Sequence, residues 1–346
     1  MTTVPCRRRG ALPAAALLAL GVMASCTSTV GPGVTDPVLL APPGADAVDL
    51  TYLGVGGWNL KRGDDVVVAA PLFTNPSFLR TGLATVRSDT TVVNRHMGTE
   101  DVSGAAAILV GHAHYDHLLD VPQVARRHAP RARILGSRVV RNTLGTWSGV
   151  ADRVLEIDSL AGDVEHAGTW IPLTPTLRVM PLRSHHAAHF DGYTLYKGST
   201  DRPLDEEPTR ADEWLDGPSY AFLVDFLHGD GSVAFRVYYQ DAVAAPPRGL
   251  APASLMEDRP VDVAILVPAT FDQVDWHPEA AVLNLRPRWV LLGHWENFFV
   301  PPAPPSRSVM LTDMGHFQDR LDRAHGGESW RPEIGTRFRF PVRPRR

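Results

Sequence analysis

The stretch that decides the fold is Gly111-His112-Ala113-His114-Tyr115-Asp116-His117, which directly follows an apolar segment. It places three imidazoles and one carboxylate close together in the chain. Neutral imidazole nitrogen and carboxylate oxygen are the ligands that zinc takes in catalytic sites. Because alternate residues of an extended segment point the same way, His112 and His114 can converge on one ion. Asp116 and His117 lie past the bend and can face a second ion.

Three other apolar segments end in side chains of the same kind. Four ligands cannot hold two ions and still leave open positions, so further ligands are expected. Each of these segments offers some at its end: Ser184-His185-His186-Ala187-Ala188-His189, Tyr238-Tyr239-Gln240-Asp241 and Leu292-Gly293-His294-Trp295. Ligands at several strand ends are what a site at one edge of a sheet sandwich requires. Only one of the three histidines at 185–189 needs to be a ligand.

Apolar runs and their breaks predict a mixture of strands and helices along the chain. An acidic, proline-containing segment at 198–218 is expected to be a surface insertion, either a solvated loop or a lid over the substrate. The predicted helices are 121–128, 279–285 and 310–323. The predicted strands are 49–53, 66–70, 105–110, 133–136, 177–182, 221–226, 233–239, 261–267, 289–292 and a short one near Phe338.

The N-terminus has the layout of a secretory signal. Arg7, Arg8 and Arg9 precede an apolar stretch that ends in Met23-Ala24-Ser25-Cys26. That ending resembles the lipobox of bacterial lipoproteins, whose cysteine carries the lipid. We expect a signal peptide at 1–25, lipidation of Cys26, a flexible tether over 26–47 and one folded domain over 48–346. The alternative is a buried N-terminal helix. The anchor predicts a membrane partner and a place in the cell envelope, on the periplasmic or extracellular side.

Composition sets wider bounds on the function. The chain has 346 residues, of which 44% are hydrophobic and 21% charged, as in ordinary soluble domains. Its formal net charge of −4 argues against a nucleic-acid partner, because phosphate binding favours a basic surface. The sequence does not set the oligomeric state.

The HxHxDH motif, followed in order by a later His, a later Asp and a final His, resembles the metallo-β-lactamase superfamily over roughly residues 49–300. The resemblance implies an αββα four-layer sandwich, in which two mixed sheets face each other with helices outside. It also implies two zinc ions. The first would be held by His112, His114 and one of the histidines at 185–189, the second by Asp116, His117 and His294, and Asp241 would bridge both.

The third ligand of the first ion is open between two neighbours. A Ser-x-His-x-x-His reading favours His186, with His185 as the alternative. His189 would then face the substrate or support the ligands. Many superfamily members carry Asp-Pro after the second strand, where this chain has Ala70-Pro71. Asp120 is therefore a candidate partner for a ligand histidine.

Tyr115 and Trp295 are similar to the superfamily branch that includes the phospholipase D acting on N-acyl-phosphatidylethanolamine and related lactonases. The resemblance implies hydrolysis, by a metal-bound hydroxide, of a phosphodiester, ester or lactone in a small-molecule or lipid-like substrate. Asp116 would orient the water or carry its proton. Tyr115, Tyr239 or His189 would donate to the substrate oxyanion. The alternatives are a non-catalytic metal-binding or scaffolding lipoprotein, and iron in place of zinc.

Overall fold

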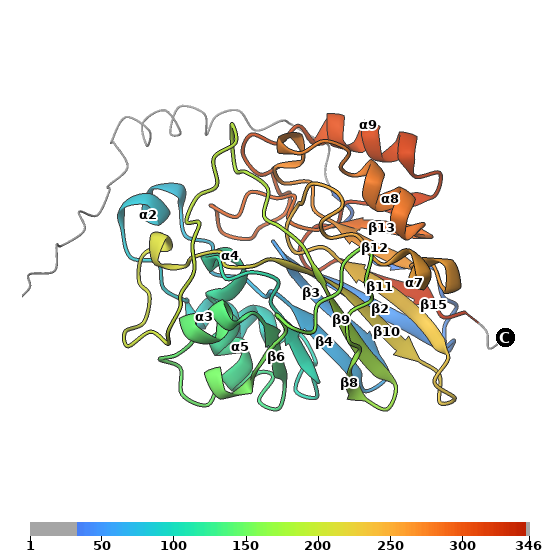
Figure 1. Cartoon of the computed structure of the whole chain (residues 1–346), viewed down its shortest axis with the longest axis horizontal. Helices are drawn as coiled ribbons and strands as arrows, with labels where there is room; N and C mark the ends of the chain where they lie inside the picture. The colour runs from blue at the N-terminus through green and yellow to red at the C-terminus, as the bar shows by residue number, and fades with distance from the viewer. Residues whose placement is uncertain (1–32, 344–346) are drawn as a thin grey trace, which may run out of the picture.

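The computed structural model describes residues 33–343, which form two sheets packed face to face with helices on their outer sides (Figure 1). In the first sheet the strands lie in the order β1 (Val38–Leu39), β15 (Arg337–Pro341), β2 (Ala47–Gly54), β3 (Gly57–Arg62), β4 (Asp65–Ala69), β5 (Ala107–Leu109), β6 (Arg133–Gly136) and β7 (Val154–Glu156). In the second they lie in the order β14 (Glu328–Trp330), β13 (Trp289–Leu292), β12 (Val263–Leu266), β11 (Val233–Tyr239), β10 (Tyr220–Leu227), β9 (Leu177–Arg183) and β8 (Ile171–Thr174). The predicted αββα sandwich is confirmed.

The helices lie in two groups, one beside each sheet (Figure 1). Those beside the first sheet are α3 (Thr90–Met97), α4 (Tyr115–Leu118), α5 (Val121–Arg127) and α6 (Arg138–Thr143), while α2 (Phe78–Leu83) lies apart from both groups, at the left of Figure 1. Those beside the second are α7 (Ala253–Asp258), α8 (Glu279–Leu285) and α9 (Met314–Ala324). Single 3-10 turns occur at η1 (Ala151–Arg153), η2 (Ala211–Glu213) and η3 (Phe271–Gln273). None of the helices within residues 33–343 combines the length and apolar character needed to cross a membrane.

Strand direction brings the ends of several strands to one edge of the sandwich. Strands β4 to β7 pair in parallel, and so do β11 to β14. Strand β9 is antiparallel to β10, which is antiparallel to β11, so β9 and β11 run the same way. Segments that follow β5, β9, β11 and β13 therefore start at one edge, as expected for polar residues that must meet in one site.

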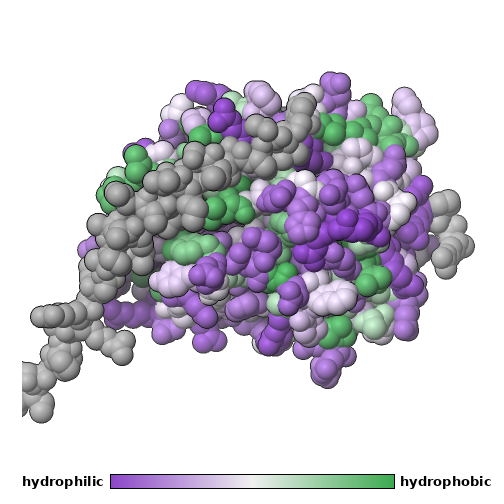
Figure 2. Space-filling view, turned by 90° about the horizontal axis from the view of Figure 1, so that it is seen from above, coloured by the Kyte–Doolittle hydropathy of each residue, from purple (hydrophilic) through white to green (hydrophobic). Residues whose placement is uncertain are grey.

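Two apolar clusters hold the layers together. The larger lies between the sheets, extends under the helices beside the second sheet, and includes fully buried Leu50, Trp58, Phe222 and Leu291. The second lies under the helices beside the first sheet and includes Ile108. Along β5, Ile108 points outward into the second cluster and Leu109 points inward into the first. Because β5 is covered on both faces, all of its residues are apolar. The face seen in Figure 2 is mostly hydrophilic, with hydrophobic residues in separate groups.

The folded part of the chain extends beyond the predicted boundary at Val48. Strand β1 pairs in parallel with β15, and Val34 forms a bridge with Pro332, so residues 33–47 pack against the domain and do not form a free tether. The Pro- and Gly-rich composition suggested a linker, but backbone pairing with the edge of the first sheet orders this segment. The predicted signal peptide, Cys26 and the first part of the predicted tether lie outside the described residues.

Segment 198–218 is packed against the domain. Trp214 is completely buried, the Asn142 side chain donates to the Thr200 carbonyl, and the Ala113 amide donates to the Asp216 carbonyl. The last of these bonds ties the segment to the histidine motif itself. Most of residues 201–213 between these anchored ends are exposed, as expected for a solvated surface insertion. None of the residues of the segment lines the cavities described below, as a lid would.

Candidate active site

The predicted ligands come together at the edge where the strands end. The chain leaves β5, passes His112 and His114, and turns into α4, which begins at Tyr115. Asp241 follows β11 and His294 follows β13. These side chains are buried, and His112 and Asp241 have no exposed surface.

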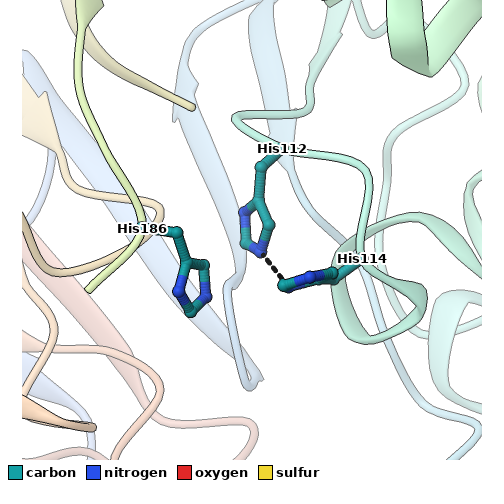
Figure 3. Close-up of side chains that lie close together, drawn as sticks. All are labelled: His112, His114 and His186. Carbon is teal, nitrogen blue, oxygen red and sulfur yellow. Dashed lines mark hydrogen bonds between the residues drawn. The ribbon is translucent and has the colours of Figure 1, made fainter. Parts of the chain in front are cut away.

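Three histidines form the first ligand group. The Nε2 atom of His112 lies 3.1 Å from Nδ1 of His114, and the donor atoms of these two residues and His186 all lie within 4.8 Å of one another. Figure 3 shows His112 and His114 on one side of the gap and His186 facing them from a separate segment. His185 is exposed and outside the group. The geometry therefore joins His186, the favoured residue, to the first group.

Asp116, His117 and His294 form the second group. The Oδ2 atom of Asp116 lies 3.6 Å from Nε2 of His117 and 3.3 Å from Nε2 of His294. A donor atom of His112 also lies within 4.8 Å of those of Asp116 and His117. The two groups therefore adjoin, as a pair of neighbouring ions would require.

Asp241 lies on the outer side of the two central imidazoles. Its Oδ2 atom is 2.6 Å from Nδ1 of His112, and its Oδ1 atom is 3.1 Å from Nδ1 of His117. The hydroxyl of Tyr239 donates to Oδ1 at 2.7 Å. These contacts fix both rings with their Nε2 atoms turned toward the two ligand groups. The bridging role implied for Asp241 stays a prediction, beside this observed role in orienting ligands.

Protonation of His112, His114, His186 and Asp116 matches what a cation needs, whereas Asp241 and Asp116 outweigh burial and raise the pKa of His117. Burial, with neighbouring His117, lowers the pKa of His112, and burial lowers that of His114 and His186 well below the usual value. Burial opposes ionisation of Asp116, but His117 and His294 hold its pKa well below the ordinary range. Three neutral imidazoles and an ionised carboxylate are therefore present at neutral pH. They are the forms that bind metal.

The spacing of the donors also fits a bound ion. Two ligand atoms about 2.1 Å from one tetrahedral zinc lie roughly 3.4 Å apart. The separations of 3.1 Å in the first group and 3.3 and 3.6 Å in the second fall around that value. Nε2 of His114 and Nδ1 of His294 are buried and have no hydrogen-bond partner among the described residues. The donor set therefore fits two adjacent divalent cations.

Two glycines allow the backbone to approach these side chains closely. A Cβ atom on Gly111 would lie 2.3 Å from Cβ of Asp241, and one on Gly56 would lie 2.8 Å from Nδ1 of His117. Real Cβ atoms do not approach so near, so any larger residue would displace the ligands. The sequence motif begins with Gly111 for this steric reason.

His294 is held in a strained backbone conformation with φ of 52°. Its amide donates to the Val55 carbonyl at 2.7 Å and to the Tyr52 hydroxyl at 3.1 Å. The Tyr52 hydroxyl and the Val55 amide both donate to the buried carboxylate of Glu296. This network positions the last ligand and was not predicted from the sequence. Its only sequence signal is an acidic residue two positions after the final histidine.

Asp120 does not contact a ligand histidine, so that expectation is wrong. Its carboxylate accepts bonds from the amides of Phe73 and Thr74 at 2.7 Å each, and from the hydroxyls of Thr74 and Ser88. It thus anchors the loop that follows Ala70-Pro71. Asp120 lies between α4 and α5, as the N-cap residue of α5, where its side chain faces this loop and not the candidate ligands.

Two cavities adjoin the ligand groups. The first, of about 120 Å³, is lined by residues that include His114, Tyr115, Tyr193 and Tyr196. The second, of about 130 Å³, is lined by residues that include His186, Asp241, His294, Ala269 and Leu311. Both are also lined by Asp116 and His189 and by the aromatic residues Phe78, Phe190, Phe298 and Phe299. The aromatic lining residues were not predicted, since nothing in their spacing marks them.

The three candidate oxyanion donors have different surroundings. Tyr115 lines the first cavity and His189 lines both. Tyr239 lines neither, and its hydroxyl lies between Asp241 and the Gly56 carbonyl. Nδ1 of His189 accepts from the Leu195 amide at 3.1 Å, and burial lowers the pKa of this residue to about 4. His189 is therefore neutral at pH 7 with its proton on Nε2.

Comparisons with known proteins agree with this architecture. Residues 73–203 match the family described as the beta-lactamase superfamily domain. No curated protein is similar enough in sequence to match. One similar solved structure is Igni18, a metallo hydrolase from the hyperthermophilic archaeon Ignicoccus hospitalis, with a TM-score of 0.54, 16% identity, and coverage of 86% of this chain and 100% of that chain. Another is an isothiocyanate hydrolase from Delia radicum gut bacteria, with a TM-score of 0.50, 12% identity, and coverage of 85% and 99%. The family match, these structural likenesses and the two facing sheets together show that this chain has the metallo-β-lactamase fold.

Proposed function

We propose that this protein is a metal-dependent hydrolase that binds two divalent cations, zinc as the expected metal, and cleaves an ester, lactone or phosphodiester bond. The observation that carries the proposal is that Asp116 belongs to a ligand group and also lines both cavities. A substrate in either cavity therefore reaches the ligand edge. A purely structural metal site would be closed on all sides by protein ligands.

The ligand set assigns the chain's own residues to two ions. His112, His114 and His186 would hold one, and Asp116, His117 and His294 the other. Divalent ions in such a pair supply Lewis acidity and a nucleophilic water near neutral pH. Asp241 holds the rings of His112 and His117 and keeps them oriented. No serine or cysteine nucleophile is required.

His189 and Tyr115 are the residues best placed to act on the substrate. The proton on Nε2 of His189 is available to a leaving oxygen or a developing oxyanion where the two cavities meet. Burial and the nearby Asp116 raise the pKa of Tyr115 well above its usual value, so its hydroxyl stays protonated and can only donate to an anionic oxygen. Asp116, held ionised, can accept the proton of an attacking water.

The similar structures support a hydrolase and leave its substrate open. Igni18 is a metallo hydrolase, and the gut-bacterial protein is an isothiocyanate hydrolase, which acts on a small uncharged electrophile. An isothiocyanate is therefore a reasonable addition to the ester, lactone and phosphodiester substrates to be screened. The non-catalytic alternative is less favoured because an open cavity reaches both ligand groups.

A substrate screen with matched variants tests the proposal. Purified protein supplied with zinc should hydrolyse at least one ester, lactone, phosphodiester or isothiocyanate, and chelation with EDTA should abolish the activity. Asp116→Asn should lose at least about a hundredfold in kcat/KM. Asp163→Asn, a change at an exposed aspartate remote from the ligand groups, should keep full activity. Turnover that is unaffected by EDTA, or equal in both variants, would contradict the proposal.

We also propose that the chain is a lipid-anchored envelope protein, on the grounds of Met23-Ala24-Ser25-Cys26 alone. Labelled palmitate should enter the wild-type protein in a bacterial host and not the Cys26→Ser variant. Equal labelling of both would contradict an anchor at Cys26.

A further inference from the structure

The two cavities adjoin at the metal-ligand edge and offer two arms to one substrate. They share Asp116, His189 and the pair Phe298 and Phe299. The first cavity runs outward to Tyr193, which is 49% exposed, and the second to Leu311, which is 36% exposed. A substrate whose reacting atom sits beside Asp116 therefore has room for one substituent on each side.

Both arms are apolar. Phe78 packs edge-on against Phe299 with ring centroids 5.3 Å apart, and Phe298 lies edge-on to His294 at 5.1 Å. Val267 and Ala269 continue the wall of the second cavity. No lysine or arginine is among the described residues that line either cavity. A charged substituent would lose its hydration there without gaining a partner.

The volumes limit the size of each substituent. The arms hold about 120 and 130 Å³, somewhat less than the cavity of roughly 150 Å³ that encloses one benzene molecule. Each arm therefore encloses a group of about five carbons. Longer chains would extend past Tyr193 or Leu311 into solvent and gain little from burial.

We propose that the substrate is a neutral carboxylic ester or lactone with a compact apolar group on each side of the scissile bond. This inference rests on the hydrolytic function proposed above and narrows its substrate class. In the reaction, the bond between the acyl carbon and the alcohol oxygen breaks. Water supplies the oxygen that joins the acyl carbon and the proton that reaches the alcohol oxygen. During this step the substituent of the acid stays in one arm and the substituent of the alcohol stays in the other.

Two ester series measure the two arms separately. In the first, methyl esters carry straight acyl chains of two to ten carbons, and in the second, acetate esters carry straight alcohols of one to ten carbons. With zinc-loaded protein, kcat/KM should rise about three- to fourfold for each methylene, because each is removed from water. The rise should stop at about five carbons in both series. A carboxylate at the end of a five-carbon chain should lower kcat/KM again and so cancel the gain from chain length.

Substitutions at the mouths of the arms test the assignment. Tyr193→Ala and Leu311→Ala should each lower kcat/KM about tenfold for six-carbon chains in one series only, a different series for each variant. Methyl acetate should change less than about twofold. Leu283→Ala is the control, because Leu283 is 70% exposed and lies on α8 away from both cavities. All three residues are surface-exposed, so their removal leaves the core intact.

Calorimetric binding of acetate, butyrate and hexanoate separates failure of the inference from failure of the function. Affinity that rises with chain length, without turnover of any ester, would overturn the hydrolytic function and uphold the apolar selectivity. Turnover that is flat with chain length, or that favours carboxylate-bearing esters, would overturn the selectivity and uphold hydrolysis. Absence of both binding and turnover would overturn both.

Discussion

His185 and His186 are neighbours in the sequence but lie in different surroundings. His186 faces His112 and His114, with ring centroids 4.8 and 5.0 Å away, whereas His185 is exposed. His186→Ala should weaken binding of at least one zinc ion by tenfold or more, because it removes a ligand and not only a supporting contact. His185→Ala is the matched control and should bind zinc as the wild type does. Titration with a competing chelator measures both, and equal loss in the two variants would contradict the assignment.

His189 should matter most when the leaving group is poor. Its Nε2 proton can pass to an alkoxide but is not needed by a phenolate, which leaves readily without protonation. His189→Gln should lower kcat/KM for a methyl ester by about a hundredfold and for the matching p-nitrophenyl ester much less. Steady-state kinetics on the two esters checks this. The same loss on both would show that His189 acts in some other way.

His277 should make the protein less stable in acid. It is buried, with Nε2 donating to the Val267 carbonyl at 2.9 Å, and burial lowers its pKa from 6.5 to about 4. Above pH 6.5 the residue is neutral in both the folded and unfolded states, so it adds no pH dependence. Between pH 6.5 and 4 the unfolded chain takes up a proton that the folded chain does not. The free energy of unfolding then falls, by up to about 3 kcal/mol.

A variant isolates this contribution from that of the other buried histidines. The loss of unfolding free energy between pH 7 and pH 5, measured with urea, should be about 1–2 kcal/mol smaller in His277→Gln than in the wild type. His166→Gln, at an exposed histidine, should match the wild type. A loss as large in His277→Gln as in the wild type would show that His277 does not resist protonation.

At the scale of elements, the turn between β5 and α4 depends on Gly111. A methyl group there would overlap Asp241, which holds His112 and His117. Gly111→Ala should therefore reduce bound zinc and activity together. Gly104→Ala, seven residues earlier, places its methyl group in open space and should leave both unchanged. Normal zinc content in Gly111→Ala would show that Asp241 does not need its observed position.

Sequence patterns predicted the strands and helices in which apolar residues form a run or recur at helical spacing. Strands β9, β10 and β11 and helix α5 were expected within one or two residues of their observed bounds. Strand β3 was missed because Gly54, Gly56 and Gly57 interrupt the apolar pattern where the chain makes a tight turn and returns antiparallel to β2. Strand β14 has only three residues and forms by pairing with β13, so its own sequence carries no signal. Helix α9 begins at Met314, later than expected, because the Asp313 side chain caps it.

At the scale of the whole molecule, the residues that gather at the candidate site could be predicted because each group of them follows an apolar strand. Their order along the chain then identified the sandwich. The residues that shape the site could not be found in this way. Glu296, Phe78 and Phe299 belong to loops or a short helix, and only the packing of the two sheets brings them to the ligands. Asp120 shows the reverse error, since closeness to the motif in sequence suggested a ligand contact that the fold does not make.

The central claim is that the two ligand groups at this edge hold two ions. Elemental analysis of the purified protein after zinc loading and desalting measures it most directly, with His117→Ala and His166→Ala prepared in parallel. Two zinc ions per chain are expected for the wild type and for His166→Ala. His117→Ala should hold at most one, because His117 belongs to the second group and its partner Asp241 also orients His112. Absence of zinc in the wild type, or an equal content in all three proteins, would contradict the account.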